Sequence, residues 1–250
     1  MQLGWADFVQ AALAAVLVGF SKTGVPGLGI LIVPLIAGIV GAKASTGLLL
    51  PMLLFADFFA VGYYKRHANW AILLKLMPWV LAGLGVGYVV LAKISTESLD
   101  VGLGALIIAL VGQQVVRDRF SELFEAHVPR ALWFSVVMGF LAGFTTMIGN
   151  VAGSITAIYL LSMGQGKNSF MGTSAWFYLT VNAIKVPLLM SLGLINAQTL
   201  VFNLKMAGFI VAGVVLGLIA FRVISQKWFD RAVLCLASFA GANLIIRALF

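Results

Sequence analysis

The chain has 250 residues and a formal net charge of +8, and 62% of its residues are hydrophobic whereas 10% are charged. Soluble proteins contain about 45–50% apolar and about 25% charged residues, so this composition excludes an ordinary soluble domain and indicates a protein whose solvent is lipid. The basic residues cluster in loops between apolar stretches, where they indicate orientation in a membrane and not binding to nucleic acid.

Apolar length and charge breaks predict ten helices in two sets of five, and the first two helices of each set are short. The predicted helices are 8–20, 27–40, 44–64, 70–92 and 98–117, then 131–144, 149–163, 169–191, 199–222 and 229–249. A helix of about 14 residues is about 20 Å long and does not cross a hydrocarbon core of about 30 Å. Each opening pair is therefore a re-entrant hairpin, two broken helices or one overlong helix, followed by three spanning helices.

The two sets also resemble each other in sequence. Residues 19–29 and 139–150 are both rich in glycine and hydroxyl side chains and are both flanked by apolar runs. Residues 75–87 and 205–217 share a lysine and an Ala-Gly pair followed by a further glycine. Duplicated halves that each carry a glycine-interrupted segment are typical of secondary transporters, which bind their substrate between the halves.

Basic residues decide how the two halves are oriented. If each opening pair returns the chain to the side where it entered, nine basic residues share one face and three lie on the other; if each pair is one crossing, the same twelve divide six against six. The nine are Lys65, Arg66, Arg117, Arg119, Arg130, Lys167, Arg222, Lys227 and Arg231, and the three are Lys43, Lys93 and Arg247. We therefore predict an all-α integral membrane protein with two inverted-topology repeats, 1–117 and 130–250. Its N-terminus is outside, and its basic loops and the linker 118–129 are cytoplasmic.

The interruptions at 21–27 and 144–150 are the predicted binding site. In lipid, non-helical backbone needs cover from protein or a water-filled cavity, so both breaks are expected in the interior. Each break exposes the N-terminus of a half-helix, which binds anions through free N–H groups and a partial positive charge. The predicted anion-binding residues are Lys22, Thr23, Gly24, Gly27, Thr145, Thr146, Gly149 and Asn150. The alternative is that these glycines only permit close packing of helices.

Ionisable residues inside the predicted spans form a second group of candidates, because charge at membrane depth is costly and faces a bundle interior. Asp57 is the only acid well inside a span, and aligning the two halves places Asn182 at the equivalent position. We expect this pair to flank a central cavity. Asp57 then carries a coupling proton or pairs with Lys22 or Lys185, and either lysine offsets substrate charge. The alternative for Asp57 is a purely structural contact.

At several of these segments the chain resembles the sulfite exporter TauE/SafE family of membrane transporters. The similar segments are 19–29 with Val33-Pro34, Gly41-Ala42-Lys43-Ala44, Tyr64 to Trp70, and Gly172-Thr173-Ser174. The resemblance adds Thr173 and Ser174 to the predicted substrate-binding residues. It implies transport of small sulfur-containing anions such as sulfite, sulfonates or thiosulfate. The chain departs from the family pattern at Gly47-Leu48-Leu49, where the family has Gly-Thr-Ser.

The predicted function is therefore a secondary transporter in a cell membrane, of the bacterial inner-membrane kind, that moves such an anion by alternating access. An anion channel and a carrier of a non-sulfur anion such as a carboxylate are the alternatives. A channel usually needs a continuous polar path, whereas the polar residues here cluster at two breaks. No enzyme is expected, because neither His67 nor His127 lies in a span where it could activate a nucleophile. Neither a metal nor a cofactor is expected, and the oligomeric state stays open.

Overall fold

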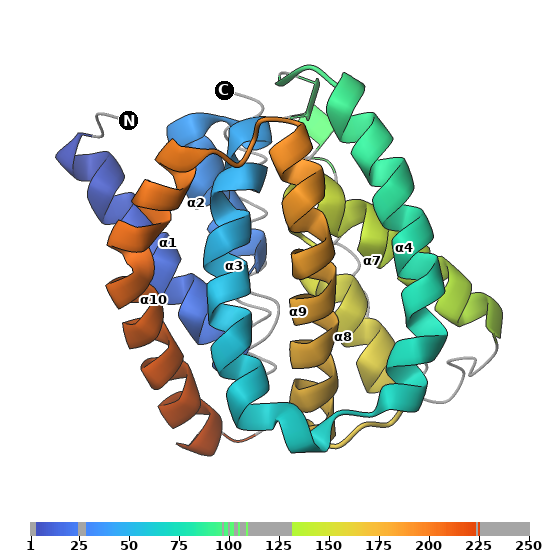
Figure 1. Ribbon diagram of the computed structural model, residues 1–250. Coiled ribbons are helices and arrows are strands. Elements are labelled where there is room, and N and C mark those ends of the chain that lie inside the picture. Colours follow the sequence, from blue (N-terminus) through green and yellow to red (C-terminus); the bar gives the residue numbers. More distant parts are fainter. Residues whose placement is uncertain are drawn as a thin grey trace.

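The computed structural model describes residues 4–24, 29–96 and 132–223, with single positions between 98 and 109 and at 225. Every regular element in these residues is helical. The helices are α1 (Trp5–Thr23), α2 (Gly29–Val40), α3 (Ala42–Tyr64), η1 (Lys65–His67), α4 (Trp70–Lys93), α7 (Leu132–Gly149), α8 (Gly153–Ser162), α9 (Lys167–Ser191) and α10 (Ala197–Val223) (Figure 1). Most of the predicted helix 98–117, the linker 118–129, the helix 229–249 and Gly27 lie outside the described residues.

The first helix of each half is longer than we expected from the glycine-rich segment that follows its predicted end. The expected ends were residues 20 and 144, but α1 continues to Thr23 over 19 residues and α7 to Gly149 over 18. At about 1.5 Å per residue both are close to 30 Å long, so they are long enough to cross a membrane. Only the second helix of each pair is short, with 12 residues in α2 and 10 in α8.

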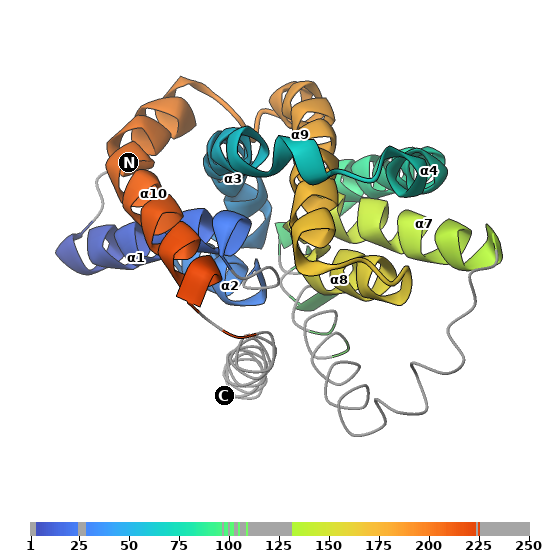
Figure 2. The same cartoon turned by 90° about the horizontal axis from the view of Figure 1, so that it is seen from below.

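The helices form two groups, which Figure 2 shows side by side from below. One group contains α1, α2, α3 and α10, and the other contains α4, α7, α8 and α9. The two groups meet where α3 packs along α9. The last described helix of each half therefore lies in the other half's group, because α10 packs along α1 and α4 packs along α7.

Helices α3 and α9 run in opposite directions, and so do α4 and α10 (Figure 1). The start of α3 lies at the end of α9, since a Cβ on Gly47 would overlap the backbone of Leu194. Its other end lies at the start of α9, since a Cβ on Gly172 would be 2.7 Å from the carbonyl carbon of His67. The C-terminal ends of α1 and α7 also lie at opposite ends of α3. The Tyr64 hydroxyl at the end of α3 donates to Thr23 O, at 2.7 Å, whereas Thr46 at the start of α3 donates to Ile148 O, at 2.9 Å.

Basic side chains lie at both ends of these helices. Lys167 at the start of α9 donates to Phe221 O at 2.6 Å, and Arg222 donates to Tyr63 Oη at 3.1 Å, so both lie at the end that carries η1. At the opposite end, Lys43 donates to Ile94 O at 2.9 Å. The described residues thus place Lys65, Arg66, Lys167 and Arg222 at one end, and Lys43 and Lys93 at the other.

Glycines set the close crossings of α1 with α10 and of α4 with α7. A Cβ on Gly19 would overlap Ile210 O across the first crossing, and one on Gly83 would overlap Phe140 O across the second. Such contacts are made because small residues let helix backbones approach closely in a membrane protein. The packing role that the sequence left as an alternative is seen at Gly24, at the end of α1, where a Cβ would lie 2.8 Å from the Cα of Gly217.

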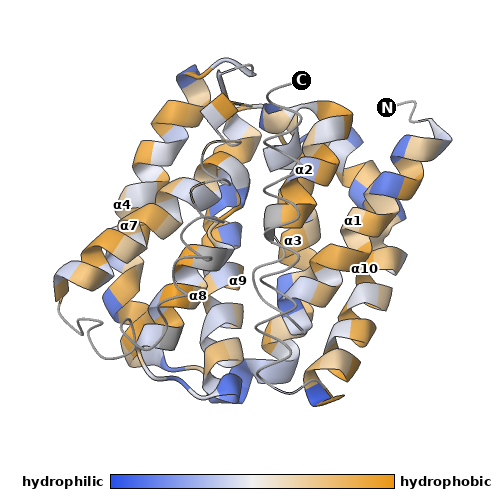
Figure 3. Ribbon diagram, turned by 180° about the vertical axis from the view of Figure 1, so that it is seen from behind, coloured by the Kyte–Doolittle hydropathy of each residue, from blue (hydrophilic) through white to orange (hydrophobic). Residues whose placement is uncertain are grey.

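Apolar side chains cover both the interior and the outer surface. Five described helical segments are long and apolar enough to cross a membrane, and α3 is the most buried of them, with 61% of its most apolar stretch inside the protein against 33% in α4 and α10. Exposed apolar residues cover the outer faces of α4 and α10 (Figure 3), among them Leu74, Leu81, Val89, Leu204, Leu216 and Ile219. A surface of this kind is stable in lipid, which confirms a multi-pass membrane protein.

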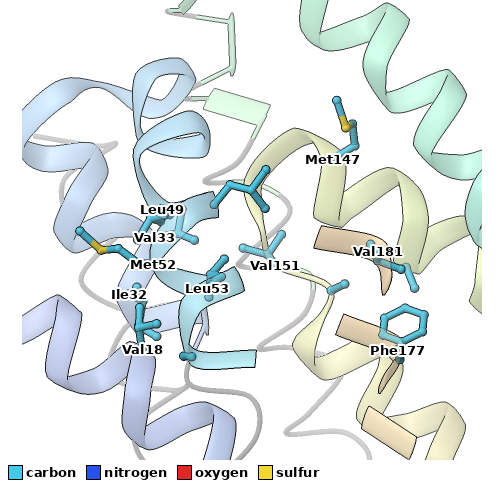
Figure 4. Close-up of a cluster of buried hydrophobic side chains, with 14 of the residues drawn as sticks. Val18, Ile32, Val33, Leu49, Met52, Leu53, Met147, Val151, Phe177 and Val181 are labelled. Carbon is cyan, nitrogen blue, oxygen red and sulfur yellow. The ribbon is translucent and has the colours of Figure 1, made fainter. Parts of the chain in front are cut away.

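The interior between the two groups is also lined by apolar side chains (Figure 4). Val18, Ile32 and Leu49 come from α1, α2 and α3, whereas Val151 and Phe177 come from the other group. This cluster is apolar, so the polar side chains beside it differ in kind from the rest of this interior.

Candidate functional site

A small polar cavity lies between the two helix groups, with walls from α1, α2 and α3 on one side and α7, α8 and α9 on the other. Its volume is about 50 Å³, counted as the space that the centre of a water molecule can reach. The lining residues include Ser21, Lys22, Asp57, Thr146, Asn150, Gly153, Ser174, Tyr178 and Asn182. One water molecule needs roughly 10–15 Å³ on this measure, so the cavity has room for an occupant of a few non-hydrogen atoms.

Helical periodicity brings the polar residues of α9 to this cavity. Ser174, Tyr178 and Asn182 follow one another at intervals of four residues, so they lie on one face of the helix. On α3, Asp57 shares its face with Leu53 and Ala60, and all three line the cavity. Since α3 and α9 pack against each other, these two faces supply opposite walls.

Asp57 is the centre of one polar cluster. Its side chain is fully buried, and its carboxylate lies 2.8 Å from the ammonium of Lys22 and accepts a 2.6 Å hydrogen bond from the Asn182 amide. The Lys22 ammonium also lies 3.9 Å from the centre of the Tyr178 ring, where a cation–π interaction is favourable. The cluster joins α1, α3 and α9, so it connects the two groups of helices.

Lys185 is the centre of a second cluster. Its side chain is fully buried, one helical turn beyond Asn182, and its ammonium donates to Thr146 O at 2.6 Å, to Thr146 Oγ1 at 3.2 Å and to Asn150 Oδ1. Three acceptor oxygens match the three N–H groups of an ammonium. Lys185 does not line the cavity itself, but Thr146 and Asn150 do, so its charge lies directly behind the wall.

These two clusters together contain two lysines and one carboxylate. The described part of the chain contains two carboxylates, Asp7 at the exposed start of α1 and Asp57. Asp57 is paired with Lys22, so no described carboxylate is paired with Lys185. A buried charge without a counter-ion is costly.

Both short helices contribute a residue to the wall of the cavity. Gly153, the first residue of α8, lines it, and so does Ile32, one turn into α2. Between α7 and α8, Asn150 has a φ of 57°, which is the left-handed region that asparagine tolerates better than most residues. Asn150 also donates to Thr46 O at 3.2 Å, so the break is held against α3.

Six of the predicted site residues line the cavity: Lys22, Asp57, Thr146, Asn150, Ser174 and Asn182. Lys185 lies behind it, as described above. Gly27 lies outside the described residues, so no position is assigned to it.

The other predicted residues lie outside this lining and make contacts of their own. Thr23 donates to Val214 O at 2.9 Å, Gly24 packs on Gly217, and Thr145 donates to Leu141 O in its own helix at 2.8 Å. Gly149 is the last residue of α7. Thr173 accepts a 2.9 Å hydrogen bond from the backbone N–H of Asn69 and so holds α9 to the segment before α4.

Sequence reasoning missed Tyr178 as a lining residue. The signal for Tyr178 was available, because it lies four residues before Asn182 and therefore on the same helical face. In the described residues no group of three or more His, Cys, Asp or Glu side chains is placed to hold a metal ion.

Comparison with known proteins assigns the chain to a family. The sequence profile described as Sulfite exporter TauE/SafE matches residues 11–244, which is nearly the whole chain. No curated protein and no solved structure matches it. The profile covers both groups of helices and every described residue of the cavity lining. The chain therefore belongs to the sulfite exporter TauE/SafE family.

Proposed function

We propose that this protein is a secondary transporter that carries a small sulfur-containing anion across the membrane by alternating access. Members of the family are transporters and not enzymes, and membrane transport of sulfur anions such as sulfite is the activity that the family suggests. The observation that carries the proposal for the site is the fully buried Lys185, which has no described carboxylate as a partner and lies behind a small polar cavity.

The anion is held between the starts of α2 and α8. The N-terminal N–H groups of a helix have no partner within it and carry partial positive charge, so they attract an oxyanion. Around this position Ser21, Lys22, Asn150 and Ser174 supply hydrogen-bond donors from both walls. The volume of about 50 Å³ favours an anion of a few non-hydrogen atoms, which is the size of sulfite or a small sulfonate.

Two repeats of inverted topology, 1–117 and 130–250 with the linker 118–129, account for the arrangement of the helices. The opposite directions of α3 and α9, and the opposed ends of α1 and α7, support this division. The end with η1 carries Lys65, Arg66, Lys167 and Arg222, which favours the cytoplasm for that end and the outside for the N-terminus.

Alternating access follows from the position of the cavity between the groups. If the group with α1, α2, α3 and α10 rocks against the other, the cavity opens first on one side of the membrane and then on the other. The hydrogen bond from Asn182 to Asp57 lies across this boundary, so it is remade in each cycle, whereas the ion pair of Asp57 with Lys22 lies within one group. A carrier of this kind shows saturable flux, whereas a channel does not.

The test is uptake into proteoliposomes of purified protein, with sulfite, methanesulfonate, thiosulfate, sulfate and acetate as substrates. We expect saturable uptake of at least one sulfur anion, and counterflow when the same anion is loaded inside. Uptake that does not saturate indicates a channel, and preference for acetate indicates a carrier of carboxylates. Either result refutes the proposal.

A pair of threonine variants tests the placement of the site. Thr146→Val keeps the volume of a lining side chain but removes its hydroxyl, and we expect anion binding to weaken by about 0.5–1.5 kcal/mol. Thr96→Val makes the same change at an exposed position beside Gly41, and we expect no effect. Equal affinity in wild type and folded Thr146→Val contradicts this placement.

A further inference from the structure

The charges around the cavity define which anions suit it. In the described residues the formal charges belong to Lys22 and Asp57, which line the cavity, and to Lys185, which contacts the lining residues Thr146 and Asn150. Lys22 is neutralised by Asp57, at 2.8 Å. Lys185 contacts only neutral oxygens, those of Thr146 and Asn150. One positive charge therefore remains without a counter-ion.

Because these side chains are buried, the single net positive charge acts strongly on an anion in the cavity. The side chains of Asp57 and Lys185 are fully buried, and that of Lys22 is 10% exposed, so salt in solution screens them weakly. An occupant with one negative charge cancels the excess. An occupant with two negative charges reverses its sign and leaves a net negative charge in a site of low dielectric constant, which is unfavourable.

We propose that the cavity selects monovalent sulfur oxyanions, such as hydrogensulfite and small organic sulfonates, over divalent ones, such as sulfate and thiosulfate. The selection arises from the net single positive charge of Lys22, Asp57 and Lys185. The inference rests on the proposed function, because it assigns the charge class of the anion that the same cavity binds.

The second half of the chain indicates how to change this charge. Asn182 is the residue that the alignment of the two halves places opposite Asp57, so an amide of the same size is already present at the equivalent position of α9. Asp57→Asn removes the only described negative charge at the cavity and leaves two positive charges. The charge of a divalent anion then balances the charge of the cavity.

The experiment measures the affinity of purified wild-type protein and Asp57→Asn for methanesulfonate, sulfate and thiosulfate. In wild type we expect methanesulfonate to bind at least about tenfold more tightly than either divalent anion, because one charge at close range outweighs the other contacts. In Asp57→Asn we expect this ratio to fall by at least about tenfold through tighter binding of the divalent anions.

A double variant separates charge from structural damage. Lys22→Gln combined with Asp57→Asn removes the ion pair as a unit and restores a single positive charge, that of Lys185. We expect the preference for methanesulfonate to return. A shift that persists in the double variant, or a single variant with the wild-type ratio, overturns the inference.

Two further outcomes separate the inference from the proposed function. Wild-type protein that binds sulfate or thiosulfate as tightly as methanesulfonate overturns the charge selection but leaves a sulfur-anion transporter. Failure of every sulfur anion to bind folded protein overturns the proposed function, and the inference fails with it.

Discussion

Replacement of Asn150 by aspartate tests whether the charge of Lys185 acts on the cavity. Asn150 lines the cavity, and its Oδ1 accepts a hydrogen bond from the Lys185 ammonium. Asn150→Asp changes one amide nitrogen to oxygen and gives Lys185 a carboxylate partner. Aspartate also tolerates the left-handed backbone at this position, where φ is 57°. The substitution cancels the excess positive charge but also removes the donor of the 3.2 Å hydrogen bond to Thr46 O, so affinity is compared only for folded protein.

The size of the effect follows from Coulomb's law. A side chain that lines so small a cavity lies about 4–6 Å from the centre of an anion inside it, and at an effective dielectric constant of about 20 the added charge costs about 3–4 kcal/mol. This corresponds to anion binding that is about a hundredfold to a thousandfold weaker. The assay is titration of the purified protein with whichever sulfur anion wild type binds, together with a thermal unfolding curve.

Asn69→Asp is the matched control. Asn69 is the N-cap of α4 and accepts a hydrogen bond from the Ile72 N–H, a role that aspartate fills equally well. It does not line the cavity. We expect wild-type affinity in this variant. If folded Asn150→Asp binds the anion as tightly as wild type, the charge of Lys185 has no part in binding and the electrostatic argument fails.

Three further predictions concern topology, packing and coupling. Single cysteines in place of Lys65 and Asn196, in an otherwise cysteine-free protein, should label from opposite sides of the membrane; labelling from the same side would mean that the halves are parallel. Gly83→Ala should lower the midpoint of thermal unfolding because its Cβ would overlap Phe140 O, with a cost of about 1–3 kcal/mol, whereas Gly85→Ala has nothing within 4 Å and should not. Equal midpoints would argue against the close crossing of α4 and α7. Asp57→Asn should uncouple uptake from a pH gradient but keep counterflow in proteoliposomes; retention of both activities would remove Asp57 from coupling, and equal loss would make it structural.

Composition and apolar length were enough to predict the membrane class and most helices, because lipid imposes strong limits on what can span it. Glycine was the less reliable guide. The glycine-rich segments 19–29 and 139–150 predicted helix breaks at 21–27 and 144–150, yet α1 continues to Thr23 and α7 to Gly149, and Gly24 packs on Gly217. A sequence without partners cannot separate these two uses of glycine, since both need the missing side chain.

The candidate site could also be predicted only in part. The sequence singled out Asp57, Asn182 and Lys185 because polar residues are costly inside a span. It could not assign their partners. Lys185 lies one turn from Asn182, but its ammonium contacts Thr146 and Asn150 at the end of α7, whereas Asn182 contacts Asp57 on α3.

The placement of α4 and α10 in the opposite groups determines the order in which the chain assembles. Synthesis delivers the N-terminal helices first. Helices α4 and α7 are neighbours in the order of synthesis among the described helices, whereas the Thr23 hydroxyl of α1 meets Val214 O of α10 only 191 residues later. The glycine-lined face of α1 therefore has no α10 to pack against until α10 is synthesised. A chain that is interrupted before α10 retains the pairing of α4 with α7 but leaves α1 without its main partner, so the first half alone does not reach its native packing.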